Sequence, residues 1–205
     1  MTQDKVRVAV VGAPGAFALK HLDGLKNIDD AEVVAVSGLG DGIQKVADDH
    51  GIPHAVQGLD AVLAMDDVDA VILATPTPVH AEQAIACLEA GKHTQVEIPM
   101  ADSLADARAV LAAADASGRI AMAGHTRRFN PSHQWVHDKV TAGEFNIQQM
   151  DVQTYFFRRT NINAKGEPRS WTDHLLWHHA AHTVDLFAFQ TQSRIVEANA
   201  IQGPI

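Results

Sequence analysis

The sequence has few cysteines, few basic residues and no long apolar run. Cys87 is its only cysteine, which excludes an internal disulfide and is typical of a reducing compartment. Its 16 Lys and Arg against 25 Asp and Glu leave a net charge of −9, so neither nucleic acid nor an anionic membrane is expected as a partner. No stretch approaches the roughly 18 apolar residues of a membrane span, and the N-terminal apolar run leads into glycines, unlike a cleavable signal. These absences predict a soluble, cytoplasmic protein.

Strand-like and helix-like segments alternate through the first 124 residues of the 205-residue chain. Ser103 followed by Asp106 resembles a capping box, and Gly118 suits the position after the last helical turn. Short β-branched runs that alternate with helices are typical of an α/β fold with a parallel, doubly wound sheet. We therefore predict a Rossmann domain over residues 1–124, with strands at 6–11, 32–36, 54–56, 70–74, 94–97 and 120–123.

The pattern changes after Gly124. We predict a loop and a helix over 125–143, a long strand over 147–157 and a polar loop. A helix over 172–190 and a strand over 194–203 follow. Residues 125–205 are thus expected to form an incomplete α+β domain with an open, mainly antiparallel sheet.

The segment VRVAVVGAPGAFALKH places a glycine-bearing turn between the first strand and a helix. Backbone N–H groups at the start of such a helix bind a dinucleotide pyrophosphate. Gly12 allows the tight turn, Gly15 allows close approach of the phosphates, and Ala18 is small enough for helix–strand packing. The spacing G-x-x-G-x-x-A departs from G-x-G-x-x-G, so a purely structural turn is the alternative. We predict that Gly12, Gly15, Ala16 and Phe17 bind the cofactor.

The second strand ends at Ser37 and Gly38, where NAD-binding domains usually carry an Asp or Glu for the ribose 2′-hydroxyl. No carboxylate here repels a 2′-phosphate, and the Ser37 hydroxyl can donate to one. We therefore predict NADP as the cofactor, with NAD as the alternative. No arginine stands adjacent to bind a 2′-phosphate. The alternative is a structural Ser-Gly turn, which would not discriminate between the two cofactors.

Five ordered segments resemble the glucose–fructose oxidoreductase / inositol dehydrogenase (Gfo/Idh/MocA) family: GAPGAFALKHLDGL, ATPTPVHAEQAIACLEAGKH, VEIPMADS, GHTRRFNP and HHAAHTVDLF. The resemblance spans the chain and implies an NAD(P)-dependent oxidoreductase acting on a CH–OH group. Family members are longer and dimerise through the sheet of the second domain. We therefore expect these 205 residues to be a piece of a longer homodimeric enzyme. The resemblance also implies cofactor contacts from Thr75, Pro76, Thr77, His80, Glu97 and Pro99.

Further segments, among them GHTRRFNPSHQW and NAKGEPRSWTDHLLWHHAAHTVDLF, resemble family members from the bacterial breakdown of lignin-derived aromatics. By this resemblance the substrate is small and anionic: the cyclic hemiacetal of a ring-cleavage semialdehyde, oxidised with NADP to a pyrone dicarboxylate. Two alternatives stay open. One is a sugar or polyol dehydrogenase of the same family, and the other is a nucleotide-binding regulator without turnover.

The chain departs from the family at two positions that usually carry charge. Ile98 replaces the lysine of a Glu-Lys-Pro motif, and His178 replaces the aspartate that commonly opens the helix motif. His178 and His182 are i, i+4 neighbours on a helix, and Asp185 lies three residues beyond His182. Since histidine titrates near neutral pH, we predict His182 as the base that takes the hydroxyl proton. We predict that His178 binds substrate or shares the proton and that Asp185 orients His182.

Two further roles are compatible with these histidines. They can be satisfied by backbone carbonyls in a buried helix, or a His-x-x-x-His pair can ligate zinc. No cysteine or HExxH glutamate stands nearby, so we expect no metal. An anionic substrate also calls for guanidinium partners, although any single arginine is more often structural. The candidates are Arg127, Arg128, Arg158, Arg159 and Arg169.

Overall fold

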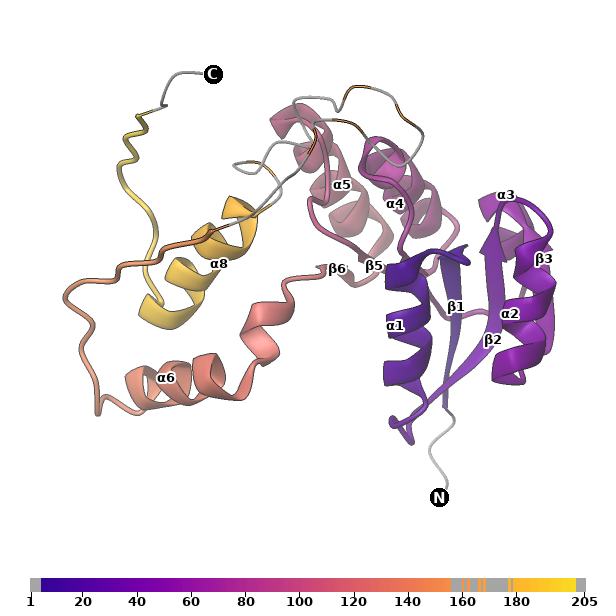
Figure 1. Ribbon diagram of the computed structural model, residues 1–205, viewed down its shortest axis with the longest axis horizontal. Coiled ribbons are helices and arrows are strands. Elements are labelled where there is room, and N and C mark those ends of the chain that lie inside the picture. Colours follow the sequence, from indigo (N-terminus) through magenta and orange to yellow (C-terminus); the bar gives the residue numbers. More distant parts are fainter. Residues whose placement is uncertain are drawn as a thin grey trace. The chain divides into compact units, whose positions relative to one another are not determined.

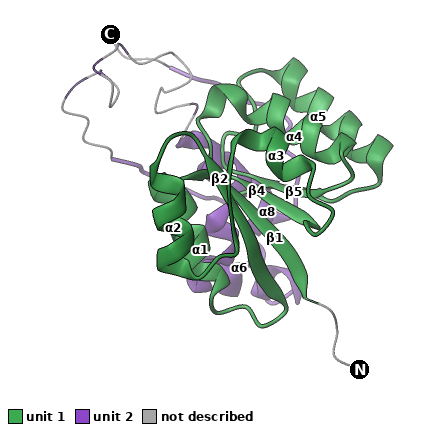
Figure 2. Ribbon diagram, turned by 90° about the vertical axis from the view of Figure 1, so that its right-hand side faces the viewer, with its two compact units in different colours: residues 1–124 green, residues 125–205 purple. Residues whose placement is uncertain are grey.

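The computed structural model describes residues 5–155, 160, 162, 166, 168, 177 and 179–201 of the chain. It divides into two compact units, residues 1–124 (unit 1) and residues 125–205 (unit 2), shown in different colours in Figure 2. The division falls at Gly124, where the sequence pattern changes. No helix in the described residues is long and apolar enough to cross a membrane.

Unit 1 is built around a parallel six-stranded sheet with the order β3-β2-β1-β4-β5-β6 (Figure 1). Val10 of β1 pairs with Val36 of β2 on one side and with Ile72 of β4 on the other. All three are buried and β-branched, as expected for strands covered on both faces. The predicted α/β fold and its six strands are confirmed. The strands are β1 (Val6–Ala13), β2 (Ala31–Gly38), β3 (His54–Gln57), β4 (Ala70–Leu73), β5 (His93–Val96) and β6 (Ala121–Ala123).

Helices cover both faces of this sheet, because alternate side chains of each strand point to opposite sides. Val10 belongs to a core with Leu22 of α1, whereas Val11 belongs to a core with Leu88 of α4 and Val110 of α5. Burying each large aliphatic side chain stabilises the unit by about 1.5–3 kcal/mol. The helices of unit 1 are α1 (Ala16–Leu25), α2 (Gly42–His50), α3 (Gly58–Leu63), the 3₁₀ turn η1 (Thr77–Val79), α4 (His80–Glu89) and α5 (Leu104–Ser117).

The capping box predicted at the start of α5 is present. The Ser103 hydroxyl accepts a hydrogen bond from the Asp106 N–H at 3.0 Å and donates to the Asp106 carboxylate at 2.7 Å. Gly118 follows the helix with a φ of 65°, a left-handed conformation that favours glycine. Local sequence signals therefore define both ends of this helix.

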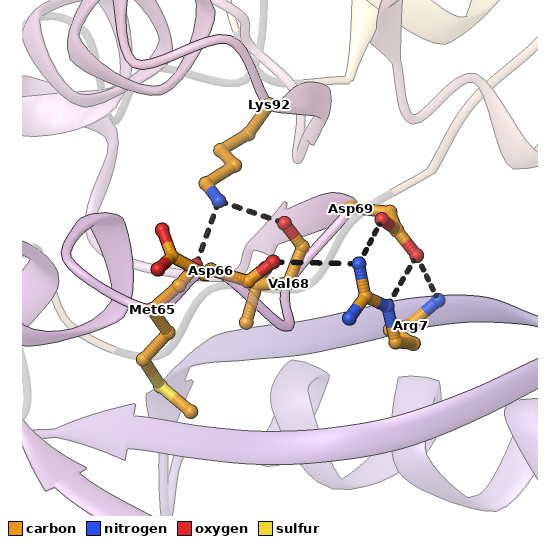
Figure 3. A network of polar contacts seen from close by, with 6 residues as sticks. All are labelled: Arg7, Met65, Asp66, Val68, Asp69 and Lys92. Atoms are coloured by element: carbon orange, nitrogen blue, oxygen red, sulfur yellow. Dashed lines mark hydrogen bonds and ion pairs between the residues drawn. The ribbon is translucent and has the colours of Figure 1, made fainter.

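Polar contacts join the amino ends of the central strands (Figure 3). Arg7, at the start of β1, donates from Nε and Nη2 to the two carboxylate oxygens of Asp69 at 2.9 and 2.7 Å. Lys92 donates to the carbonyls of Met65 and Val68 at 2.7 and 2.8 Å. Ligands of open α/β sheets bind at the carboxyl ends of the strands. This network therefore braces the sheet at the end away from the expected ligand site.

Unit 2 contains a 3₁₀ turn, η2 (Thr126–Phe129), and the helices α6 (Pro131–Thr141) and α8 (Ala180–Thr191). Asn130 caps α6 by accepting the Ser132 N–H at 3.0 Å. The helices meet where the His137 ring stacks on Phe189, with centroids 3.9 Å apart. Over 125–143 we predicted a loop and then a helix, and α6 confirms the helix, while the loop contains the turn η2. The helix predicted over 172–190 is confirmed for its described C-terminal part.

The strands predicted in unit 2 are wrong over their described residues. Residues 147–155 and 194–201 are irregular, and Val196 and Ile201 are 97% and 101% exposed. A strand needs a neighbour for its N–H and C=O groups. Within the described part of unit 2, the only pairing is an isolated antiparallel bridge between Ile162 and Pro168.

Candidate active site

The turn after β1 has the geometry of a phosphate-binding turn. Gly12 adopts a φ of 112°, and a Cβ added there would collide with the carbonyl oxygen of Ala74, so glycine is required. The Gly15 N–H donates to the Gly12 carbonyl at 2.8 Å, and α1 begins at Ala16. N–H groups in the first turn of a helix have no intrahelical acceptor, so those of Ala16 and Phe17 are available to an anion. Ala18 is fully buried, as its predicted packing role requires.

The structure corrects the role predicted for Ser37. Its side chain is 0% exposed, and its hydroxyl donates to the Gly58 carbonyl at 2.6 Å. A hydroxyl engaged in this way cannot donate to a ribose phosphate. Gly38 is constrained as well, because a Cβ there would overlap the carbonyl of Ala13. The first exposed side chain beyond β2 belongs to Leu39, which is 86% exposed.

His80 joins the loops that follow β4 and β5. Its Nε2 lies 2.7 Å from the Thr75 carbonyl and its Nδ1 lies 2.8 Å from the Pro99 carbonyl. The residue is 1% exposed, which corrects the expectation that it touches the cofactor. Its ring instead links the two loops, because one nitrogen contacts each of them. Thr75 is held further by its hydroxyl, which donates to Gln83 at 2.6 Å, while Pro76 remains exposed.

Glu97 is held by a histidine from α1. The Nε2 atom of His21 lies 2.6 Å from Glu97 Oε1, with side-chain exposures of 20% and 14%. Glu97 follows β5, and its N–H donates to the Leu73 carbonyl of β4 at 3.0 Å. The pair therefore connects the helix that follows the glycine turn with the carboxyl end of β5.

In unit 2, Asp185 is bound by Arg128. Arg128 Nε and Nη2 donate to the two oxygens of Asp185 at 2.9 and 2.6 Å, and this pairing raises the pKa of Arg128. The guanidinium also lies 5.1 Å from the centre of the Phe189 ring. Two of the Arg128 donors therefore serve Asp185, and the prediction that Arg128 also binds a substrate carboxylate stays a prediction. The orienting role that we predicted for Asp185 toward His182 also stays a prediction.

His182 lies on α8, as predicted, beside a histidine that the sequence reasoning missed. The rings of His182 and His125 meet edge to face, with centroids 6.3 Å apart and an interplanar angle of 81°. His125 Nδ1 is 3.7 Å from an Asp185 oxygen. Burial lowers the pKa of His125, and the nearby Arg128 adds to this effect, while Asp185 opposes it. The Nδ1 atoms of both rings are buried.

Arg127 remains a candidate for binding an anion. It lies on η2, next to Arg128, and its Nη1 donates to the Thr183 hydroxyl at 3.4 Å. Within the described part of the chain, no salt bridge involves Arg127. The predicted residues that fall outside the described part are His178, Arg158, Arg159 and Arg169. Among the described residues, no group of three or more His, Cys, Asp or Glu side chains could hold a metal ion.

Comparison with known proteins gives the family. Residues 6–125 match the family described as "Oxidoreductase family, NAD-binding Rossmann fold", and residues 131–205 match "Bacterial oxidoreductases, C-terminal". The chain belongs to the Gfo/Idh/MocA oxidoreductase family. The resemblance seen in the ordered sequence segments is confirmed.

One relative matches nearly the whole chain. The chain is 65% identical over 201 residues to the 4-carboxy-2-hydroxymuconate-6-semialdehyde dehydrogenase of Sphingobium sp., covering 98% of this chain and 63% of the relative. A probable dehydrogenase from Thermotoga maritima has a similar structure, with a TM-score of 0.64, 30% identity, and coverage of 67% and 41%. A 3-ketoreductase from Actinomadura kijaniata, solved with NADP, has a TM-score of 0.62, 30% identity, and coverage of 68% and 44%. The chain thus spans less than two thirds of each of these proteins.

Three residues of the candidate site were not predicted from the sequence: His21, Gln83 and His125. His125 had a usable signal, since it follows β6 directly after Gly124, near the carboxyl end of the strand where ligands bind in such sheets. His21 and Gln83 stand within helices at positions that no motif marks. Their partners, Glu97 and Thr75, come from distant segments.

Proposed function

We propose that this chain carries the cofactor unit and the catalytic histidine of an NADP-dependent dehydrogenase. Its substrate is the cyclic hemiacetal of 4-carboxy-2-hydroxymuconate-6-semialdehyde, and its product is 2-pyrone-4,6-dicarboxylate. The observation that carries the proposal is the 65% identity with the Sphingobium dehydrogenase over 98% of the chain. The presence of His182 on α8 beside a second histidine supports turnover rather than a purely regulatory role.

The residues of unit 1 fit a dinucleotide. The glycine turn leaves the N-terminus of α1 open to a pyrophosphate, and Gly12 cannot carry a side chain without striking Ala74. From Ser37 at the end of β2 to Gly40, no carboxylate stands to repel a 2′-phosphate. Because the Ser37 hydroxyl is buried, the missing carboxylate is the sequence feature that still favours NADP over NAD. The NADP-bound 3-ketoreductase is a structural relative that supports it.

The proposed chemistry assigns one proton transfer to this chain. A bound nicotinamide would supply the hydride acceptor. The Nε2 atom of His182 takes the hemiacetal hydroxyl proton as the O–H bond breaks and the C–H electron pair leaves as hydride. Ile98 cannot share this work, because its side chain has no titratable group. We assign a substrate carboxylate to Arg127 on η2, because no salt bridge among the described residues involves its guanidinium.

The test is steady-state reduction of NADP and NAD, with the semialdehyde hemiacetal and myo-inositol compared as substrates. Rapid NADPH formation with the hemiacetal alone is the expected result. Preference for inositol would replace the proposal with a polyol dehydrogenase, and cofactor binding without turnover would indicate a regulator. His182→Ala should lower kcat by roughly 10²–10⁴-fold and leave cofactor affinity unchanged. His54→Ala is the matched control, because His54 begins β3, two strands from β1, and its side chain is 49% exposed.

A further inference from the structure

The imidazole of His125 lies beside the proposed base in unit 2. His125 is the last residue before η2 and packs its ring against that of His182 on α8. The centroid distance of 6.3 Å and the angle of 81° lie within the range of edge-to-face aromatic pairs. An imidazole held in this way limits the orientations open to its neighbour.

The charges around His125 define which of its nitrogens carries the proton. Its Nδ1 is buried and lies 3.7 Å from Asp185, the nearest carboxylate. A negative oxygen on that side favours the tautomer with hydrogen on Nδ1, so Nε2 keeps its lone pair. Among the residues that the structure describes, the charged or titratable groups that face the ring are Asp185 and His182 from α8 and Arg128 from η2.

Asp185 orients His125 without giving it a full positive charge. Because Arg128 binds both oxygens of Asp185, much of the carboxylate charge is already compensated. The His125 side chain is only 23% exposed, and burial lowers its pKa. A neutral ring next to His182 does not repel the proton that His182 must accept, whereas an imidazolium would.

We propose that His125 is a positioning residue for His182: it fixes the orientation of the His182 ring and stabilises the positive charge that this ring gains on accepting the substrate proton. Arg128 and Asp185 hold His125 in turn. The inference rests on the proposed function only in taking His182 as the base.

Two substitutions separate the parts of this role. His125→Phe keeps an aromatic ring against His182 but removes both nitrogens, and His125→Asn keeps an N–H near Asp185 but removes the ring. Both variants should lower kcat by about tenfold, a minor share of the 10²–10⁴-fold that a positioned base contributes. NADP affinity should change less than about twofold. In His125→Phe the acidic limb of the kcat/KM pH profile should move to lower pH, because the charged form of His182 loses stabilisation. Wild-type kcat and an unmoved acidic limb in both variants would overturn the proposal.

A measurement without turnover separates this inference from the proposed function. The Cε1–H resonance of His182 can be followed against pH by NMR in the wild-type protein and in His125→Phe, with His54→Phe as the control. The midpoint for His182 should fall in His125→Phe and stay constant in His54→Phe, whose side chain is 49% exposed in unit 1. A fall in the midpoint with no activity on the hemiacetal would support the positioning role and reject the substrate assignment. An unchanged midpoint would reject the positioning role even in an active enzyme.

Discussion

The glycine turn after β1 gives the sharpest test of the cofactor site. In Gly12→Ala, the backbone must hold an L-residue at a φ of 112°, in the region that favours glycine. A positive φ costs an L-residue about 1–2 kcal/mol. The new methyl group also overlaps the carbonyl of Ala74. The backbone of Ala74 is held in place, because its N–H donates to the Val11 carbonyl at 2.8 Å. Relieving such an overlap in a packed region costs about 1–3 kcal/mol.

The two contributions predict a loss of about 2–5 kcal/mol in the free energy of unfolding of unit 1. Gly118→Ala supplies the matched control, since Gly118 has a φ of 65° but no atom within 4 Å of an added Cβ. It should lose only the conformational part, about 1 kcal/mol. Movement of the turn should also weaken NADP binding at least tenfold in Gly12→Ala, which corresponds to about 1.4 kcal/mol.

Urea unfolding and a fluorescence titration with NADPH measure these two quantities. Urea curves must be fitted for each unit where the transitions separate, because a chain of two units need not unfold in one step. The reasoning would be refuted if Gly12→Ala matched Gly118→Ala in stability and bound NADPH as well as the wild type does. In that case the turn would have room for a side chain, and its geometry would not explain cofactor binding.

Three further predictions concern other parts of unit 1. Burial raises the pKa of the Cys87 thiol to about 12, so a thiol reagent at neutral pH should react only after denaturation; rapid labelling of the native protein would contradict this. The hydrogen bonds from Arg7 lower the pKa of Asp69 to about 2, so Asp69 favours the folded state above pH 4 and loses this effect between about pH 4 and pH 2. The difference in urea midpoint between the wild type and Asp69→Asn should therefore shrink over that interval, and a constant difference would count against it. Leu39→Asp places a carboxylate just past β2 and should reduce the ratio of kcat/KM for NADP over NAD by about tenfold, with Leu39→Asn as the uncharged control; an unchanged ratio would move the 2′-phosphate site elsewhere.

The corrections at the site have a common physical cause. Ser37 stands at a position where a hydroxyl can donate to a phosphate. In the folded chain this hydroxyl donates instead to the carbonyl of Gly58, which lies 21 residues away in the sequence. Arg128 has the chemistry to bind a substrate carboxylate, but two of its donors bind Asp185, which lies 57 residues further along the chain. A side chain binds the partner that the folded chain brings nearest, and sequence spacing does not encode that distance.

The sequence by itself determined the Rossmann unit. Its β-branched runs, the glycine turn at Gly12 and Gly15, and the cap at Ser103 are local signals, and each acts within a few residues. The family followed from ordered motifs of the same local kind. His182 was identifiable because its spacing on a single helix is also local.

Only the tertiary structure decided which side chains meet. The pairs His21–Glu97, Arg128–Asp185 and His125–His182 each join segments more than 50 residues apart. The irregular residues 147–155 and 194–201 show the same dependence, because their β-branched and alternating patterns make a strand only where a neighbouring strand takes up the backbone groups. Local propensity therefore fixed the elements of unit 1, whereas the site depends on long-range contacts that no short stretch of sequence specifies.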